Sequence, residues 1–233
     1  MKSLRGGNSR SIERPYFRLR EIEEICASEL RKVDLYPAEP GPVRIDRFIE
    51  KRFGVTHEYQ DLPDGVLGFT RFGKNGVEAV IVARTLDEGG AKATERRLRA
   101  TLAHESGHGL LHAHLFSLGE KPRSLFEDGD TTPRILCREV IGGPASSSRR
   151  RVNWSEFQAN RAIGGLLMPR ALVARALEEF CTSAGQLGHK VLKPDKRDSA
   201  IRALSTAFDV NPIVARIRLE EVFPLKNDAQ LPL

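Results

Sequence analysis

Apolar residues recur every three or four positions in two segments near the N-terminus, residues 17–33 and residues 43–53. This spacing places the apolar side chains on one face of a helix, so the pattern predicts two amphipathic helices. The apolar positions are Leu19, Ile22, Ile25 and Leu30 in the first segment and Ile45, Phe48 and Ile49 in the second. Prolines within residues 37–42 separate the two helices, because proline interrupts helical hydrogen bonding.

The pattern changes after Gly54. Residues 55–60, 65–72 and 77–85 are richer in β-branched and aromatic residues, which is typical of strands. Residues 73–76 have the sequence Gly-Lys-Asn-Gly and join the last two segments as a hairpin turn. The sequence therefore predicts a small antiparallel sheet.

Longer helices follow the predicted strands. Residues 92–115 carry leucines at helical spacing without a proline, and residues 154–168 predict another helix that ends before Pro169. Residues 117–153 read as a long irregular segment, and residues 194–225 read as mostly helical. A run of strands bounded by helices indicates the α+β class.

The length and composition narrow the type of protein. A chain of 233 residues can bury a substantial core, and we expect a main unit, residues 1–175, with a C-terminal helical segment, residues 176–233. No apolar run approaches the roughly 18 residues of a membrane helix, and the first residues lack a signal-peptide core. Three widely spaced cysteines do not form a disulfide framework, so a reducing, cytoplasmic location is expected.

Two histidines, His104 and His108, lie four residues apart in the predicted helix of residues 92–115. Residues at this spacing share a helix face, so both imidazoles can bind one metal ion. Glu105 follows the first histidine, as in the H-E-x-x-H zinc hydrolases, where the glutamate takes a proton from metal-bound water. Zinc lowers the pKa of that water to about 7. The other interpretation is a buried helix whose histidines are hydrogen-bonded in the core.

A catalytic zinc site needs a third protein ligand and an open fourth position. Glu156 lies in the first turn of the second long helix, where its carboxylate can reach the metal or can merely complement the positive helix end. Asn160, one turn later, can hydrogen-bond the outer nitrogen of a ligating histidine and fix its tautomer. We expect His112 to face the core or to support a ligand.

Two linked motifs carry a resemblance to a known family. Residues 101–112 read Thr-Leu-Ala-His-Glu-Ser-Gly-His-Gly-Leu-Leu-His, residues 156–160 read Glu-Phe-Gln-Ala-Asn, and residues 166–169 read Leu-Leu-Met-Pro. These motifs resemble the ImmA/IrrE family of bacterial zinc metallopeptidases, whose pattern is T-L-A-H-E-x-G-H-x-x-L-H followed by E-x-x-A-N and L-L-M-P. Both halves match in order.

The resemblance implies a zincin-like core in which His104, His108 and Glu156 bind Zn²⁺ and Glu105 is the general base. The chain departs from the family pattern at residues 162–165, where Ala-Ile-Gly-Gly replaces the usual Phe-Ala. Each glycine inside a helix costs about 1 kcal/mol relative to alanine. The pair either allows close packing against the zinc helix or marks a loosened turn.

The segment between the motifs contains Cys137 and three consecutive arginines, Arg149, Arg150 and Arg151. A thiolate binds zinc strongly, so a cysteine in the open position would keep the enzyme silent until it is displaced. The CapP-like members, which regulate anti-phage systems, are understood to work in this way, with single-stranded DNA as the activator; residues 135–138 loosely resemble them. The alternatives are a buried cysteine and a solvated loop. With a net charge of +6, the arginines are candidates for contacts with nucleic acid.

Residues 204–219 resemble a helix-turn-helix, with Asn211 as the N-cap and Pro212 at the first helical position. A DNA-reading helix would turn Arg216 and Arg218 outward. The same pattern also serves for packing or for recognition of a protein substrate, and we favour these roles over DNA binding.

The residues predict a cytoplasmic zinc endopeptidase with a protein substrate and no membrane partner. The resemblance implies that the substrate is a transcriptional repressor of the helix-turn-helix type, cleaved in response to DNA damage or phage infection. The alternative is a zinc-stabilised sensor or DNA-binding regulator without peptidase activity, in which the metal has a structural role.

Overall fold

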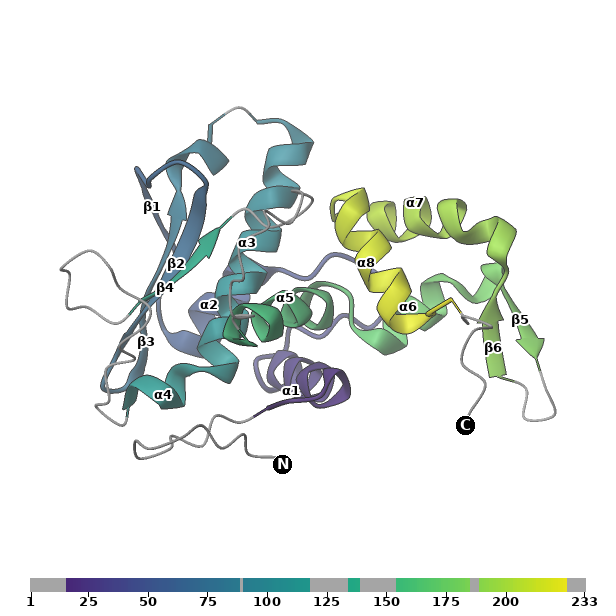
Figure 1. Cartoon of the computed structure of the whole chain (residues 1–233), viewed down its shortest axis with the longest axis horizontal. Coiled ribbons are helices and arrows are strands. Elements are labelled where there is room, and N and C mark those ends of the chain that lie inside the picture. The colour runs from purple at the N-terminus through teal and green to yellow at the C-terminus, as the bar shows by residue number, and fades with distance from the viewer. Residues whose placement is uncertain (1–15, 89, 118–133, 139–153, 185–188, 226–233) are drawn as a thin grey trace.

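The computed structural model describes residues 16–88, 90–117, 134–138, 154–184 and 189–225, and for residues 116, 117, 134–138, 184 and 189 it describes the backbone alone. The fold is mixed α+β (Figure 1). In this part of the chain the α-helices are α1 (Leu19–Lys32), α2 (Ile45–Phe53), α3 (Lys92–Leu111), α4 (Ala113–Ser117), α5 (Trp154–Leu167), α6 (Arg170–Ala176), α7 (Arg197–Ala207) and α8 (Pro212–Val222). The strands are β1 (Glu58–Gln60), β2 (Val66–Gly73), β3 (Gly76–Ala83), β4 (Arg134–Arg138), β5 (Cys181–Ala184) and β6 (His189–Leu192).

The helices predicted from apolar spacing are confirmed. Helix α1 buries Ile22, Cys26 and Leu30, which recur every four residues along one face. Helix α2 ends at Gly54, whose φ of 74° lies in the left-handed region that glycine adopts without steric cost. The third predicted helix is divided, because α3 ends at Leu111 and the short α4 follows it.

The main sheet has the strand order β1-β3-β2-β4. Strands β2 and β3 form the predicted antiparallel hairpin, in which Gly73 pairs with Gly76. The expectation of a purely antiparallel sheet is wrong, because β1 runs parallel to β3, with Tyr59 opposite Val82. Strand β4 pairs with the other edge of β2, so the free edge of β3 is the place where β1 can join. Strand β4 also lies within the segment that we had read as irregular.

Helix α3 lies between the sheet and a layer of helices (Figure 1). One side of α3 contacts β2 and β3, and its other side is crossed by α5, which in turn packs against α1 and α8. Because both sides are covered, residues 100–109 of α3 are buried all round the helix. Polar residues placed in this stretch are therefore shielded from bulk water, which strengthens their electrostatic interactions.

The C-terminal helices are attached to α3 through Asp209, in the turn between α7 and α8. Asp209 has a φ of 50°, and its carboxylate accepts hydrogen bonds from Arg96 at 2.9 Å and Arg99 at 3.3 Å. The predicted N-cap position of Asn211 and helix start at Pro212 are confirmed. The hairpin of β5 and β6 was not predicted, since we expected residues 176–233 to be helical.

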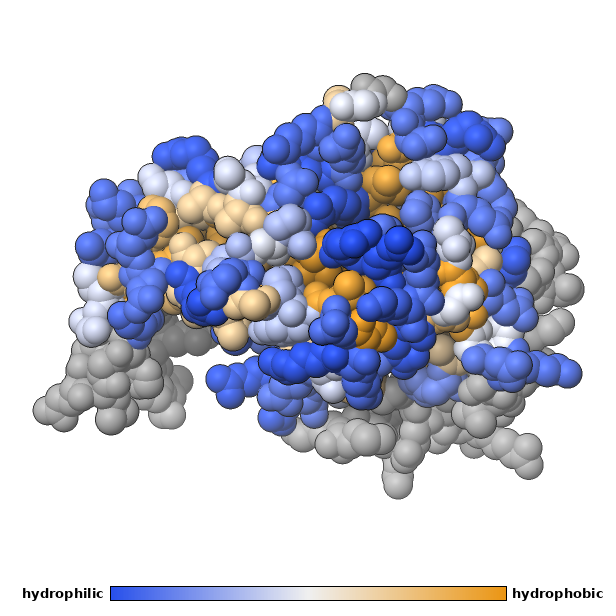
Figure 2. All heavy atoms as spheres, turned by 180° about the vertical axis from the view of Figure 1, so that it is seen from behind, coloured by the Kyte–Doolittle hydropathy of each residue, from blue (hydrophilic) through white to orange (hydrophobic). Residues whose placement is uncertain are grey.

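One hydrophobic core joins elements from α1 to α8, including Ile22, Phe48, Leu166 and Leu219. The predicted boundary between residues 175 and 176 falls in the last turn of α6 and stays a prediction. Figure 2 shows the face opposite to that of Figure 1, where polar residues cover most of the surface and apolar residues appear between them. Within the described ranges, no helix combines the length and the apolar character needed to cross a membrane.

Candidate metal centre

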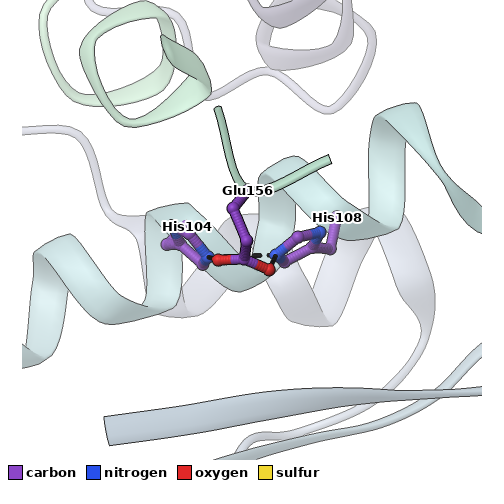
Figure 3. A group of neighbouring side chains, drawn as sticks. All are labelled: His104, His108 and Glu156. Atoms are coloured by element: carbon purple, nitrogen blue, oxygen red, sulfur yellow. Dashed lines mark hydrogen bonds and ion pairs between the residues drawn. The ribbon is translucent and has the colours of Figure 1, made fainter. Parts of the chain in front are cut away.

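The close crossing of α3 and α5 brings the two sequence motifs together. A Cβ atom built on Gly107 would lie 2.7 Å from Ala162 Cβ, closer than real side chains approach, and 3.2 Å from Ala159 Cα, which is also a tight contact. Glycine at position 107 and alanines on α5 therefore allow the two backbones to approach. As a result, the first turn of α5, which carries Glu156, lies over the histidines of α3 (Figure 3).

His104, His108 and Glu156 converge on one point, as the sequence predicted. In Figure 3 the Glu156 carboxylate lies between the two imidazoles. Its Oε2 is 3.2 Å from His104 Nε2, and its Oε1 is 3.2 Å from His108 Nε2. The two Nε2 atoms are 3.0 Å apart. These three side chains form a group that can hold a metal ion.

The donor atoms and their spacing fit zinc. Zinc binds histidine nitrogen and carboxylate oxygen at about 2.0–2.2 Å, so two ligands of a tetrahedral site lie about 3.3 Å apart. The two Nε2 atoms are 3.0 Å apart, and each lies 3.2 Å from a different oxygen of the Glu156 carboxylate, so these donor pairs are close to this spacing. Three protein ligands leave one tetrahedral position for water or substrate, which is the arrangement of catalytic zinc sites.

Asn160 fixes the tautomer of His104, in the role predicted for it. Asn160 Oδ1 lies 3.0 Å from His104 Nδ1. An amide oxygen is only an acceptor, so Nδ1 carries the proton of the neutral imidazole. The lone pair of His104 is then on Nε2, the atom that faces Glu156 and the centre of the site.

A second chain of hydrogen bonds sets the tautomer of His108. Gln158 Oε1 lies 3.1 Å from His112 Nε2, which therefore carries the proton of His112. His112 Nδ1 is then an acceptor and lies 3.0 Å from His108 Nδ1, which donates. The lone pair of His108 is consequently on Nε2, directed at the metal position. His112 thus supports a ligand, as expected, whereas the role of Gln158 was not predicted.

Burial keeps these histidines neutral. Desolvation lowers the pKa of His108 to about 4 and, together with its proximity to His108, lowers the pKa of His112 to about 3. A neutral imidazole is the form that binds metal. At neutral pH, therefore, a metal ion does not have to displace a proton from His108.

Glu156 is held as a carboxylate. Burial by itself would raise its pKa, but hydrogen bonds and charge from His104 and His108, present when protons rather than a metal ion lie at their Nε2 atoms, outweigh this effect and lower the pKa to about 2. The site therefore offers one negative charge and two neutral nitrogen donors, which is chemically suited to a divalent cation.

The predicted general base, Glu105, points from α3 toward the sheet. Thr70 on β2 donates a hydrogen bond of 2.7 Å to Glu105 Oε2, and the Thr70 hydroxyl also lies 3.1 Å from the Glu105 carbonyl oxygen. A Cβ atom built on Gly68 would lie 3.4 Å from Glu105 Oε1, so β2 passes directly over this carboxylate. Neither Thr70 nor Gly68 was predicted, because no motif marks them.

The glycine pair in α5 does not pack against α3. A Cβ atom on Gly164 would lie 2.9 Å from Arg218 Cδ on α8, and one on Gly165 would lie 3.0 Å from Cys26 Sγ on α1. The pair thus allows close packing, but against α8 and α1. Close approach to the metal helix depends instead on Gly107.

Arg218 is fully buried and does not face outward, as DNA reading would require. Its guanidinium donates hydrogen bonds to Glu23 at 2.5 Å, Glu221 at 2.9 Å and the Met168 carbonyl at 3.0 Å. Arg216, two positions earlier, is exposed. The burial of Arg218 agrees with the packing role that we favoured for this helix.

The other candidate residues lie partly or wholly outside the described residues. Arg149, Arg150 and Arg151 fall within residues 139–153. The backbone of Cys137 is in β4, opposite Gly68 of β2, but its side chain is not described. Zinc ligation by Cys137 and nucleic-acid contacts by the arginines stay predictions.

Comparison of the chain with protein-family models finds no match, and no curated protein matches it. The geometry of the three side chains and the sequence motifs therefore carry the functional argument.

Proposed function

We propose that this chain is a zinc-dependent endopeptidase. The observation that supports this most strongly is the convergence of the Glu156 carboxylate with both Nε2 atoms of His104 and His108, each at 3.2 Å. These residues come from motifs about fifty positions apart, and the helix crossing brings them together with Glu105 as the next residue on α3. A chance pair of core histidines would not require a carboxylate between them.

In the proposed hydrolysis of a peptide bond, each residue of the site has a separate role. Zinc, when bound to His104, His108 and Glu156, activates a water molecule and polarises a carbonyl oxygen. Glu105, oriented by the Thr70 hydroxyl, accepts the proton of the nucleophilic water and returns it to the leaving amine. Asn160 keeps the His104 lone pair aimed inward.

The biological role rests on the resemblance to the ImmA/IrrE family. The substrate is a protein, namely a transcriptional repressor of the helix-turn-helix type, and cleavage responds to DNA damage or phage infection in the cytoplasm. Single-stranded DNA is a candidate activator. Cys137 is the candidate inhibitory ligand: its thiolate, if bound to zinc, would keep the site inactive until the signal displaces it.

Zinc content and peptide cleavage test the proposal together. The purified protein should contain one zinc ion per chain, and Glu156→Ala should lose most of it. Glu105→Gln should retain zinc and lose cleavage of a defined peptide library, because a glutamine cannot accept the proton. Glu95→Ala, an exposed acid on the same helix, is the matched control and should change neither quantity. Retained cleavage in Glu105→Gln would contradict the mechanism.

The alternative is a zinc-stabilised sensor or DNA-binding regulator. X-ray absorption separates it from the enzyme, because nitrogen and oxygen donors alone indicate an open hydrolase site. A sulfur donor that disappears in Cys137→Ala, with a rise in cleavage, would indicate the latent enzyme. A permanent sulfur donor without cleavage in either protein would favour the regulator.

A further inference from the structure

A groove with a volume of about 460 Å³ lies between α5 and α8. One wall comes from Phe157, Asn160 and Gly164 of α5, and the other from Ile213 and Ile217 of α8. Hollows of about 300–1,000 Å³ are large enough to enclose most of a small ligand or several side chains of a peptide. None of the proposed metal ligands lines the groove, and neither does the proposed base, Glu105.

The walls of this groove expose large apolar side chains. Phe157 is 43% exposed, Ile213 40% and Ile217 43%. Only three other large apolar residues of the described chain are exposed, Tyr16, Val191 and Leu225, and none of them lines the groove. Apolar side chains that gather in one hollow, rather than singly, are typical of a binding surface.

A partly buried ion pair joins the two walls. Glu221 of α8 accepts a hydrogen bond of 2.5 Å from Arg161 of α5. Arg218, on α8 like Glu221, donates a second one of 2.9 Å that fixes the Glu221 carboxylate. The absence of a side chain at Gly164 lets the Arg218 chain pass close to α5. The groove is therefore formed before any partner arrives, which reduces the entropy lost on binding.

The groove borders the metal centre at Asn160. This side chain lines the groove, and its Oδ1 contacts His104 Nδ1 at 3.0 Å. Phe157 follows the metal ligand Glu156 directly in α5. A peptide that runs from the metal position along α5 would therefore meet Phe157, one wall of the groove, next to the ligand Glu156.

The composition of the groove favours a peptide over a nucleic acid. The exposed positions of α8 that line it are two isoleucines four residues apart, Ile213 and Ile217, and the acidic Glu220, whereas Arg218 is buried. An apolar hollow with a few charged groups at its margin is the usual form of a protein-binding site. Phosphate groups would instead require exposed basic residues along α8.

We propose that this groove is the specificity pocket of the site and binds a bulky aliphatic or aromatic side chain of the protein substrate, a few residues from the bond that is cut. This assignment rests on the proposed peptidase function for its role in cleavage. Binding of the apolar side chain, however, can be measured without any cleavage.

The test uses the full chain carrying Glu105→Gln, loaded with zinc, and a synthetic library of ten-residue peptides analysed by affinity selection and mass spectrometry. The retained peptides should be enriched in leucine, isoleucine, methionine or phenylalanine. In the same background, Ile217→Asp should weaken their binding about tenfold or more, since it removes apolar surface from one wall. Phe157→Ala, from the other wall, should have the same effect.

The matched control is Arg216→Asp, an exposed neighbour on α8 that does not line the groove; it should change binding less than about twofold, within the range of surface substitutions. If the Ile217→Asp and Phe157→Ala proteins bound the peptides as tightly as the parent Glu105→Gln protein, the assignment would be overturned. Retained peptides without apolar enrichment would overturn it as well. A dimer that dissociates in Ile217→Asp would also overturn it, because the groove would then be filled by a second copy.

Cleavage of the same peptides by the protein with Glu105 intact separates the two proposals. Peptides that bind through Ile217 but are never cut would support the groove and contradict the peptidase. Peptides that are cut equally well by the Ile217→Asp protein would support the peptidase and contradict the groove.

Discussion

The Thr70 hydroxyl of β2 donates a hydrogen bond of 2.7 Å to the Glu105 carboxylate of α3. Both residues are completely buried, so no bulk water competes for this contact. The sheet therefore orients the residue that we propose as the base, while α5 supplies the third metal ligand. The two halves of the site are built from opposite sides of α3.

Thr70→Val should reduce kcat without reducing zinc content. Valine has nearly the same shape, but it cannot hold the Glu105 carboxylate, and the loss of one hydrogen bond to a charged group corresponds to about tenfold or more in rate. Steady-state cleavage and metal analysis measure the two effects. Thr70→Ser restores the hydroxyl and should recover most of the rate; if it does not, Thr70 contributes through packing alone.

Asn160→Ala should weaken zinc binding by about 10- to 100-fold, the usual effect of removing a hydrogen-bond partner of a ligating histidine. The reason is that His104 can then take the tautomer that places its proton on Nε2. Competition with a zinc chelator measures the affinity. Asn160→Asp keeps an oxygen acceptor and should retain tight binding, so equal losses in both variants would contradict the tautomer argument.

Gly107→Ala should destabilise the protein and weaken zinc binding, although alanine favours helix formation by about 1 kcal/mol. The added Cβ would meet Ala162 Cβ at 2.7 Å and force α5 away from α3. Overpacking of this kind costs about 1–3 kcal/mol. Urea denaturation with and without zinc tests the result. An unchanged or raised free energy of unfolding would mean that the crossing is looser than described.

The free energy of unfolding of the zinc-free protein should fall as the pH is lowered from about 6.5 toward 4. Burial gives His108 a pKa of about 4 and His112 one of about 3, whereas histidine in an unfolded chain has a pKa of about 6.5. In this window the unfolded chain binds more protons, so each histidine contributes a slope of up to about 1.4 kcal/mol per pH unit.

Urea denaturation at several pH values measures this slope. Removing one titrating group by His112→Gln should make the slope smaller. A stability that does not change between pH 6.5 and 5 would show that these histidines are accessible to water.

Arg218→Met should destabilise the protein by about 3 kcal/mol or more, because Glu23 and Glu221 lose a shared buried partner. The arginine contacts outweigh burial and lower the pKa of Glu23, so its carboxylate is charged at neutral pH. Arg216→Met, at an exposed position of the same helix, should change stability by less than about 0.5 kcal/mol. Thermal denaturation of the two variants compares them, and similar midpoints would contradict the description of a buried ion cluster.

The local features of this chain could be predicted from its sequence. Apolar spacing found α1 and α2, and the Gly-Lys-Asn-Gly turn at residues 73–76 found the β2–β3 hairpin. The group that could hold a metal was also found, because His104 and His108 share one helix face and Glu156 opens the second motif. Each of these features is marked by residues close together in the sequence, or by motifs with a characteristic spacing between residues.

The features that were missed depend on contacts between distant segments. The parallel pairing of β1 with β3 leaves no mark in residues 58–60, and the hydrogen bond from Thr70 to Glu105 requires the sheet to be in place. Gln158 could have been noticed, since it lies inside the second motif, but its partner is defined only by the helix crossing. Strand β5, the first strand of the short C-terminal hairpin, lacks the alternation of apolar and polar residues that predicts a strand.

The attachment of Asp209 to Arg96 and Arg99 has an evolutionary consequence. Both arginines lie on α3, about one to two turns before His104. The turn between α7 and α8 therefore packs against the same helix that carries the two histidines. A gene shortened before α7 would leave these cations and the buried faces of α5 and α6 uncovered. We therefore expect the C-terminal helices and the candidate metal centre to depend on each other for a stable fold, and to be inherited together.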